Sequence, residues 1–257
     1  MQLDFFHAEG WQVIRDLVPL ELIAAERTFL ETQMERALAL LLPETPYPDL
    51  DALIADLPAI QQRPEWRHPL SPAAKSILSG HFDLQTRLAP ELRLIPGCTP
   101  VRALIQALFP GERLRMHMPP TARFILPGHD LASVPAHQDI SYNPHLSNFV
   151  TLWCPLVPVD AACGGVLIYQ GSQTLAAQPV TATADFWLTG IATTGYKPIF
   201  TPMQPGDVLL LNRWIVHASM PNRSARVRFS IDHRFFSGHS HKHYLELDSG
   251  EVVAPEA

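Results

Sequence analysis

Near its C-terminal end the chain reads Gly206-Asp207-Val208-Leu209-Leu210-Leu211-Asn212-Arg213-Trp214-Ile215-Val216-His217. The Gly-Asp pair at its start is typical of a turn, and the apolar run that follows is short and ends at a polar asparagine. A short apolar run between turn residues predicts a buried β-strand. We therefore expect a strand over Val208–Asn212, with His217 a few residues beyond its end.

Elsewhere in the chain, other short runs rich in β-branched or aromatic residues are bounded by Pro, Gly, Asn or Asp. Many short strands without alternating helices favour a sandwich, a jelly roll or a barrel. The 25 prolines support a loop-rich β architecture, because proline breaks helices and is confined to strand ends and loops. The expected strands are Arg113–Met118, Arg123–Leu126, Phe149–Cys154, Gly165–Tyr169 and Val227–Phe236.

The N-terminal part has a different pattern. Apolar residues recur at three- and four-residue spacing from Glu21 to about Leu41, which predicts a helix, and a short β-like segment, Trp11–Ile14, precedes it. A further helix is expected over Pro100–Leu108, with Thr99 as its N-cap and proline in its first turn.

Residues 43–75 carry seven prolines and predict an irregular excursion with at most one short helix, near Asp49–Asp56. Two interpretations remain open, because long loops in compact domains are often functional: a plain surface loop, or a lid over a pocket.

Composition limits the class of protein. The formal net charge of −6 argues against general binding to nucleic acid, because no basic patch is available to neutralise phosphates. The first residues lack the basic region and long apolar core of a signal peptide, and no stretch is long and apolar enough to span a membrane. Three cysteines without paired spacing make a disulfide framework or zinc ribbon improbable. We expect a soluble, cytoplasmic protein.

His137-Gln138-Asp139 is the first candidate for chemistry. In an extended segment residues i and i+2 project from the same face, so the imidazole and the carboxylate can reach one ion. Two histidines and one carboxylate form the facial triad of iron(II) enzymes, and His217 is the candidate for the third ligand. The motif alone is weak, since His81-Phe82-Asp83 repeats it; without a β-rich run before it, we interpret that second copy as a surface or helix-cap pair.

Arg228 follows His217 by eleven residues, on the expected strand that contains Arg226-Val227-Arg228-Phe229-Ser230. A dicarboxylic co-substrate needs a cation for its far carboxylate, and the guanidinium fork of arginine binds a carboxylate in a bidentate manner. Arg226 shares the strand face with Arg228, so periodicity does not choose between them.

Taken in order, these motifs resemble the phytanoyl-CoA dioxygenase family, in which an HQD-x-x-Y segment, a glycine-rich loop with G-S-(H/Q), and an H-x-S-x-x-N-x-S-x-x-x-R ending recur. The resemblance covers most of the chain and is weakest between about residues 45 and 110. The matching segments are Pro127-Gly128, His137–Tyr142, Gly164-Gly165, Gly171–Gln173, Gly206-Asp207 and His217–Arg228, together with an N-terminal match from Phe5 to Pro19.

The resemblance implies a mainly β fold with N-terminal helices and a double-stranded β-helix (jelly-roll, cupin-like) core. It also implies a single domain over residues 1–257, with a helical and loop-rich flank (1–110), the jelly-roll core (111–236) and a C-terminal tail (237–257). The metal implied is iron(II), held by His137, Asp139 and His217.

The same resemblance implies 2-oxoglutarate as co-substrate, clamped by Arg228, with Ser219 and Trp153 beside it. The strand before Pro127-Gly128 offers only Arg123 as a further polar contact. The implied reaction uses O2 to hydroxylate an unactivated C–H bond of a small molecule, natural-product or amino-acid-like, and releases succinate and CO2. Halogenation is disfavoured, because related halogenases lack the carboxylate that Asp139 supplies.

Substrate contacts are expected only from position: Gln138, Tyr142, Asn143 and Arg234. The alternating His239, His241 and His243 are interpreted as a solvated segment. Two other functions remain open, a cupin-like metal-dependent isomerase or epimerase, which would not need Arg228, and a non-catalytic β-barrel binding module. The oligomeric state is left open.

Overall fold

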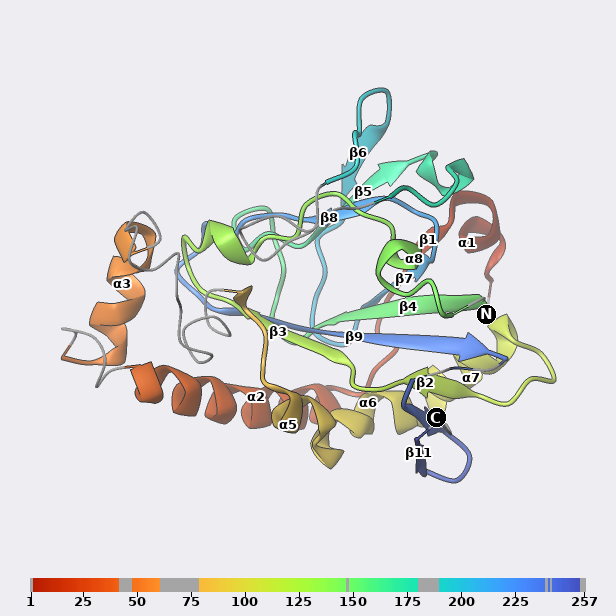
Figure 1. Cartoon of the computed structure of the whole chain (residues 1–257), viewed down its shortest axis with the longest axis horizontal. Helices are drawn as coiled ribbons and strands as arrows, with labels where there is room; N and C mark the ends of the chain where they lie inside the picture. The colour runs from red at the N-terminus through yellow and green to blue at the C-terminus, as the bar shows by residue number, and fades with distance from the viewer. Residues whose placement is uncertain are drawn as a thin grey trace.

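Strands β4 (Asn148–Pro155) and β9 (Arg228–Ser237) form the centre of the larger sheet (Figure 1). They pair antiparallel from Asn148 opposite Ser237 to Pro155 opposite Ser230. The computed structural model describes residues 2–41, 48–60, 79–146, 148–179, 190–238, 240 and 242–254. Within these ranges the larger sheet has the order β1-β7-β4-β9-β2-β10-β11, with β3 also paired to β9, and a smaller sheet has the order β6-β5-β8.

The remaining strands are short, as the many turn residues predict. In the larger sheet they are β1 (Trp11–Ile14), β2 (Arg115–His117), β3 (Thr121–Ile125), β7 (Val208–Asn212), β10 (Tyr244–Glu246) and β11 (Val252–Val253). In the smaller sheet they are β5 (Val166–Gln170), β6 (Lys197–Phe200) and β8 (His217–Ser219).

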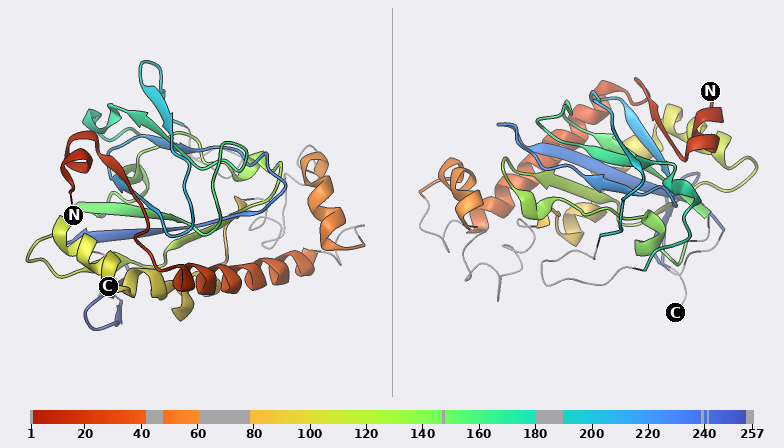
Figure 2. Two further views of the ribbon diagram at one scale, coloured as in Figure 1. Left: turned by 180° about the vertical axis from the view of Figure 1, so that it is seen from behind. Right: turned by 90° about the horizontal axis from the view of Figure 1, so that it is seen from above.

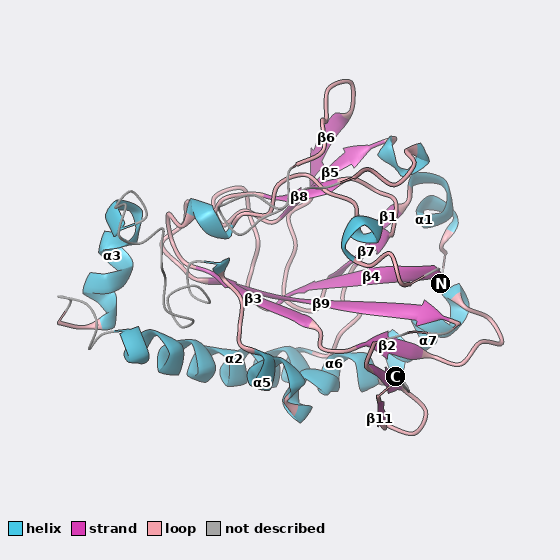
Figure 3. Cartoon of the chain, in the orientation of Figure 1, coloured by secondary structure: helices cyan, strands magenta, loops and turns pink. Residues whose placement is uncertain are grey.

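Helices cover the outer face of the larger sheet, and the smaller sheet lies over its inner face (Figures 1, 2 and 3). The long helix α2 runs along that outer face beside α6 and α7. The helices are α1 (Asp4–Glu9), α2 (Leu20–Leu41), α3 (Leu50–Ile60), α5 (Leu84–Leu88), α6 (Leu94–Gly97), α7 (Thr99–Leu108) and α8 (Asp139–Tyr142), with 3-10 turns η3 (Pro90–Arg93), η4 (Asp130–Ala132) and η5 (Ser172–Thr174).

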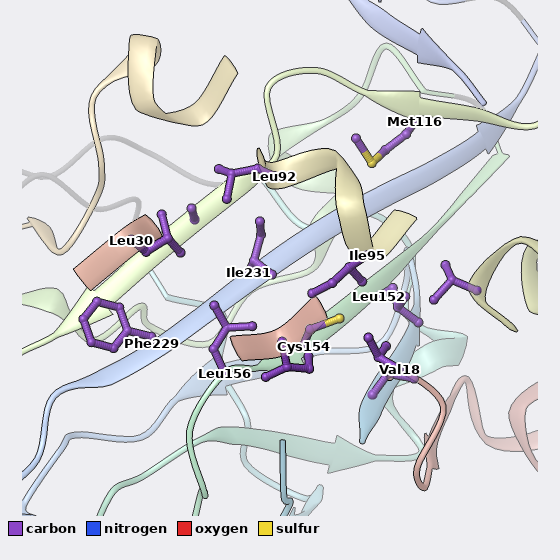
Figure 4. Close-up of a cluster of buried hydrophobic side chains, with 14 of the residues drawn as sticks. Val18, Leu30, Leu92, Ile95, Met116, Leu152, Cys154, Leu156, Phe229 and Ile231 are labelled. Atoms are coloured by element: carbon purple, nitrogen blue, oxygen red, sulfur yellow. The ribbon is translucent and has the colours of Figure 1, made fainter. Parts of the chain in front are cut away.

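The main core fills the space between these helices and the larger sheet (Figure 4). Leu30 of α2 and Ile95 of α6 are fully buried there against Leu152 of β4 and Ile231 of β9. Removing these side chains from water stabilises the packing of the helices on the sheet, by roughly 1.5–3 kcal/mol for each fully buried residue of this size. The opposite face of the same strands carries polar residues beside a second, smaller apolar cluster that includes Trp153.

The sequence located the longest of these elements, namely α2, α3, α7, β4 and β9. The strands expected over Trp11–Ile14 and Val208–Asn212 are confirmed at both ends, and the first long helix begins at Leu20, one residue early. Thr99 is not the N-cap of α7: Cys98 occupies that position without a side-chain hydrogen bond, and the helix begins at Thr99 itself.

Two expectations concern segments at the edges of the structure. Within 43–75, the helix near Asp49–Asp56 is confirmed as the longer α3, but residues 43–47 and 61–75 lie outside the described residues, and so does the choice between loop and lid. The expected tail contributes β10 and β11, since β10 pairs with β2 at the edge of the larger sheet. His239 and His241 also lie outside the described residues, whereas His243 is exposed. No helix in the described ranges is both long and apolar enough to cross a membrane.

Candidate metal centre and active-site cavity

His137 and His217 are brought together by their own backbones. Each donates its N–H to the carbonyl oxygen of the other, with N···O distances of 2.9 and 3.0 Å, so that a bridge joins the loop before α8 to the start of β8. Their ring centroids lie 4.3 Å apart. The distant ligand that the sequence proposed is therefore adjacent to the first one in space.

Both imidazoles are fixed in the same tautomer. Nδ1 of His137 lies 2.8 Å from the carbonyl oxygen of Pro135, and Nδ1 of His217 lies 3.1 Å from that of Ile215. A carbonyl oxygen only accepts hydrogen bonds, so in each ring Nδ1 carries the proton and Nε2 keeps its lone pair. Burial first, and then the neighbouring His217, lower the pKa of His137 to about 3, which keeps the ring neutral. A neutral imidazole held at Nδ1 is the form that binds a metal.

Asp139 completes the centre. Gln138 has extended backbone, so His137 and Asp139 share one face as the i, i+2 spacing predicts. Burial opposes ionisation of the carboxyl, but the positive charge of Arg234, 3.1 Å away, acts together with smaller contributions from His217, His137 and the Thr151 hydroxyl, and their sum holds the pKa of Asp139 well below its usual range. Thr151 donates its hydroxyl to the other carboxylate oxygen.

One candidate ligand atom from each of the three residues lies within 4.8 Å of the other two, and all three residues are buried. Two neutral imidazoles and a carboxylate, already oriented by backbone and side-chain partners, fit a divalent transition metal with open coordination positions. The residues present therefore fit the metal that the sequence indicated.

A cavity of about 240 Å³ lies next to these ligands, between the two sheets. Strand β9 lines it with alternate residues, Arg228, Ser230, Asp232 and Arg234. The residues between them, such as Ile231, point into the core. One strand thus separates the hydrophobic core from a polar cavity, because successive side chains in a strand project to opposite faces.

Arg228 lines the cavity, whereas Arg226 does not. The Arg228 side chain is buried and donates to the carbonyl oxygen of Met220 at 2.9 Å, and burial lowers its pKa to about 10, so it stays charged at neutral pH. No carboxylate of the described residues forms an ion pair with it. Arg226 is exposed and pairs with Asp160 at 2.6 Å. Of the two arginines that periodicity did not separate, Arg228 is therefore the one that faces the cavity.

The other expected co-substrate residues, Ser219, Trp153 and Arg123, line the same cavity. Arg123 is buried and donates to the carbonyl oxygens of Ser79, at 3.1 Å, and Ala132. Burial and the charge of Arg228 lower the pKa of Arg123 to about 9, so two guanidinium groups act on the same part of the cavity.

Of the expected substrate contacts, Tyr142, Asn143 and Arg234 line the cavity. Arg234 holds Asp139, and Asn143 donates to the backbone oxygen of Asp139 at 3.0 Å. Gln138 lies outside the lining, and its amide donates to the oxygen of Trp214 at 2.8 Å and accepts from the backbone of a neighbouring loop. Gln138 therefore holds these loops in place rather than facing a substrate.

Sequence reasoning missed several cavity residues. His81 was expected at the surface or in a helix cap, but it lines the cavity, and burial first, then Arg123, hold its pKa well below the usual range. Of the His81 and Asp83 pair, Asp83 is the residue that caps a helix, accepting from the backbone N–H of Thr86 at 2.7 Å. Ser230 and Asp232 could have been found from their alternation with Arg228. No local signal marks His81, His117 or Arg87, because the fold brings them in from the segments before β3.

Comparison with known proteins agrees with this geometry. The family model described as phytanoyl-CoA dioxygenase (PhyH) matches residues 41–230. A 1-deoxypentalenic acid 11-beta-hydroxylase of Streptomyces arenae is 35% identical over 135 residues, which cover 48% of this chain and 48% of the relative. A hydroxylase of the same name from Streptomyces exfoliatus is 34% identical over the same length. The chain spans about half the length of these curated relatives.

Two solved structures share the fold. EvdO2 of Micromonospora carbonacea var. aurantiaca has a TM-score of 0.62 at 19% identity, with coverage of 91% of this chain and 88% of EvdO2. The non-haem alpha-ketoglutarate-dependent carbocyclase SnoK from nogalamycin biosynthesis has a TM-score of 0.55 at 20% identity, with coverage of 99% and 92%. The expected mainly β fold with a jelly-roll core is confirmed. Since the family model covers most of the sequence, the chain belongs to the phytanoyl-CoA dioxygenase family.

Proposed function

We propose that this chain is an iron(II)- and 2-oxoglutarate-dependent oxygenase that uses O2 to hydroxylate an unactivated C–H bond of a small organic substrate, with release of succinate and CO2. One observation carries the proposal. Two imidazole groups and a carboxylate converge beside a cavity that also holds the buried, charged guanidinium of Arg228. A metal triad and a cation for a diacid are the two parts that this reaction requires together.

His137 and His217 would bind iron(II) through Nε2, and Asp139 through one carboxylate oxygen. When bound, iron(II) and 2-oxoglutarate would supply the electrons that activate O2, the oxidant, for cleavage of the C–H bond. The protein's part would be to present these three side chains together at the wall of the cavity, where a substrate can approach the metal that they hold. Thr151 and Arg234 restrict the Asp139 carboxylate, which limits how it can turn toward the metal.

The far carboxylate of 2-oxoglutarate would be bound by Arg228, with Ser219 beside it. Arg228 reaches the cavity from the first residue of β9, and Met220 fixes one of its nitrogens, so its fork is oriented before the diacid arrives. Burial excludes competing water, which strengthens a charge-assisted hydrogen bond. Trp153 forms part of the wall, and Arg123 adds positive charge that favours a diacid.

The other functions considered account less well for these residues. A cupin-like isomerase would not need a buried arginine in the cavity beside the metal ligands. A simple binding module would not need Thr151 and Arg234 to hold the Asp139 carboxylate in place. Both matched Streptomyces relatives are named hydroxylases, which supports hydroxylation as the outcome.

Turnover of the co-substrate tests the proposal. The purified protein, given iron(II), ascorbate, 2-oxoglutarate and O2, is expected to form succinate, faster with a true substrate, and to incorporate label from ¹⁸O2 into the product. His217→Ala should abolish succinate formation, while His243→Ala, which removes an exposed imidazole, should leave it unchanged. Absence of both 2-oxoglutarate binding and succinate formation in the folded, iron-loaded wild type would overturn the proposal.

A further inference from the structure

The cavity carries more positive than negative charge. Among the residues that the structure describes, four arginines and two carboxylates, Asp139 and Asp232, line it. Four positive charges against two negative ones leave a surplus of two. Charges removed from water are costly unless they are paired, so a surplus of this kind indicates that the occupied cavity contains anions. The arginines are Arg87, Arg123, Arg228 and Arg234.

The proposed metal and co-substrate do not remove this surplus. Iron(II) brings two positive charges and 2-oxoglutarate two negative ones, so together they are neutral. This step rests on the proposed function. With both bound, the cavity still holds two positive charges more than negative ones. The remaining partner is the organic substrate, whose charge must then be negative if the site is to be balanced.

With 2-oxoglutarate bound at Arg228, Arg87 is the arginine whose charge is least compensated. Arg234 is paired with Asp139 at 3.1 Å, and Arg123 and Arg228 lie toward the proposed co-substrate end. Arg87, from α5, donates through Nε to the carbonyl oxygen of Pro120 at 2.8 Å. In the described part of the chain no carboxylate comes within ion-pair distance of Arg87. Its terminal nitrogens are thus available to a ligand in the cavity.

Arg87 lies away from Arg228 along the cavity. The charges that act on it are those of Arg234 and Asp232, and it in turn acts on His81 and His117. Arg228 and Arg234 are six residues apart on β9, or roughly 20 Å at 3.3 Å per residue. An anion bound by Arg87 would therefore not compete with a diacid held by Arg228. It would also relieve the repulsion between Arg87 and Arg234, two like charges in a confined space.

We propose that the substrate of this enzyme is an organic acid and that Arg87 binds its carboxylate, with Arg234 adding charge from behind. A carboxylate suits this position because the fork of a guanidinium matches its two oxygens. Anchoring one end of the molecule at Arg87 would leave its carbon skeleton extending toward the metal. Arg87 is thereby assigned as a residue that determines substrate specificity.

Binding of a matched pair of probes tests this assignment. The probes are cyclohexanecarboxylate and its neutral isostere cyclohexanecarboxamide, added to protein loaded with Mn(II) and saturating 2-oxoglutarate. Paramagnetic broadening of the probe's proton signals by Mn(II) reports binding near the metal. The acid is expected to bind at least tenfold more tightly than the amide. Arg87→Gln should abolish that preference, Arg87→Lys should keep part of it, and Arg36→Gln, an equal change of charge on the exposed face of α2, should leave it intact.

Affinity for 2-oxoglutarate, measured by titration of the same proteins loaded with Mn(II) alone, separates the two proposals and confirms that the variants fold. It should stay within about twofold of wild type in Arg87→Gln. If wild type binds neither Mn(II) nor 2-oxoglutarate, the proposed function itself fails. If both bind, but the acid shows no advantage over the amide or Arg87→Gln retains that advantage, the assignment of Arg87 is overturned.

Discussion

At the scale of single residues, the side chains that hydrogen-bond to Asp139 are as important to the candidate metal site as the three proposed ligands. Thr151 reaches the carboxylate from β4 and Arg234 reaches it from β9, so each of its oxygens has a protein partner before a metal is present. The two imidazoles are held in the same way by backbone carbonyl oxygens. Such outer contacts fix the direction of a ligand's lone pairs, and their loss typically weakens metal binding 10- to 100-fold.

Thr151→Val tests this support. Valine has nearly the same shape as threonine but cannot donate to Asp139, so we expect the dissociation constant for Mn(II) to rise about 10- to 100-fold with the fold unchanged. Titration followed by electron paramagnetic resonance measures it. Thr32→Val, which removes a hydroxyl on α2 far from the centre, is the control. An affinity within twofold of wild type would show that the Thr151 contact does not orient the ligand.

The buried carboxyl of Glu26 is expected to make the stability of the protein depend on pH. It is fully buried on α2 and accepts from the backbone N–H of Ile95 at 2.9 Å, and burial raises its pKa from 4.5 to about 8. The folded state therefore holds a proton that the unfolded chain releases above pH 4.5. The free energy of unfolding that this retained proton contributes is fully present below pH 4.5. It is lost as the pH rises toward 8, by up to roughly 1.4 kcal/mol per pH unit.

Glu26→Gln keeps the acceptor oxygen but cannot ionise. We expect it to match the wild type near pH 5 and to be more stable than the wild type at pH 8, as measured by urea unfolding at both values. Parallel pH profiles for the two proteins would contradict a neutral Glu26 in the folded state.

At the scale of elements, strand β9 links the core to the cavity by alternation. Phe229 and Ile231 face the helices, while Arg228, Ser230 and Asp232 face the cavity. A shift of one residue in its register would bury the arginine in the core and expose the phenylalanine to the cavity. The long pairing with β4 prevents this.

The short helix α5 carries Arg87, and its N-cap is the side chain of Asp83. Loss of a cap costs typically about 1 kcal/mol. We expect Asp83→Ala to lower the melting temperature by roughly 2–4 °C, as scanning calorimetry would show. Asp83→Asn should have little effect, because asparagine caps a helix equally well. Equal destabilisation by both substitutions would mean that the charge of Asp83, and not its capping bond, is what counts.

The sequence predicts elements whose signal is local. Apolar runs such as Val208–Asn212 and the helical periodicity before Leu41 stand out without any partner. The triad could be proposed because two of its ligands share one extended segment. His81 was misplaced because what buries it is its pairing with Arg123 on β3, a contact far away in sequence. Short strands such as β8 and β10 depend on their neighbours in the sheet, and three residues carry too little pattern to be recognised.

At the scale of the whole molecule, the two sheets meet at the candidate metal centre. His217 belongs to the smaller sheet, whereas the residues that hold Asp139 belong to the larger one. A metal bound there would tie the sheets together, and a ligand that binds only the folded state stabilises it by mass action, by about 2.7 kcal/mol at 100 times its dissociation constant.

We therefore expect Mn(II) with 2-oxoglutarate to raise the melting temperature by roughly 5–10 °C in a thermal-shift assay. EDTA should reverse the increase, and His217→Ala should not show it. An equal increase in that variant would mean that the ions act elsewhere on the molecule.

In the proposed active site, His137, Asp139 and His217 hold one ion, and Arg228 holds the far carboxylate of a diacid bound to that ion. Anomalous diffraction from a crystal soaked with Mn(II) and 2-oxoglutarate tests this most directly. We expect one manganese peak within coordination distance of all three side chains, and 2-oxoglutarate extending from it to a bidentate contact with Arg228. A manganese peak elsewhere, or a 2-oxoglutarate that leaves Arg228 without a carboxylate, would contradict it.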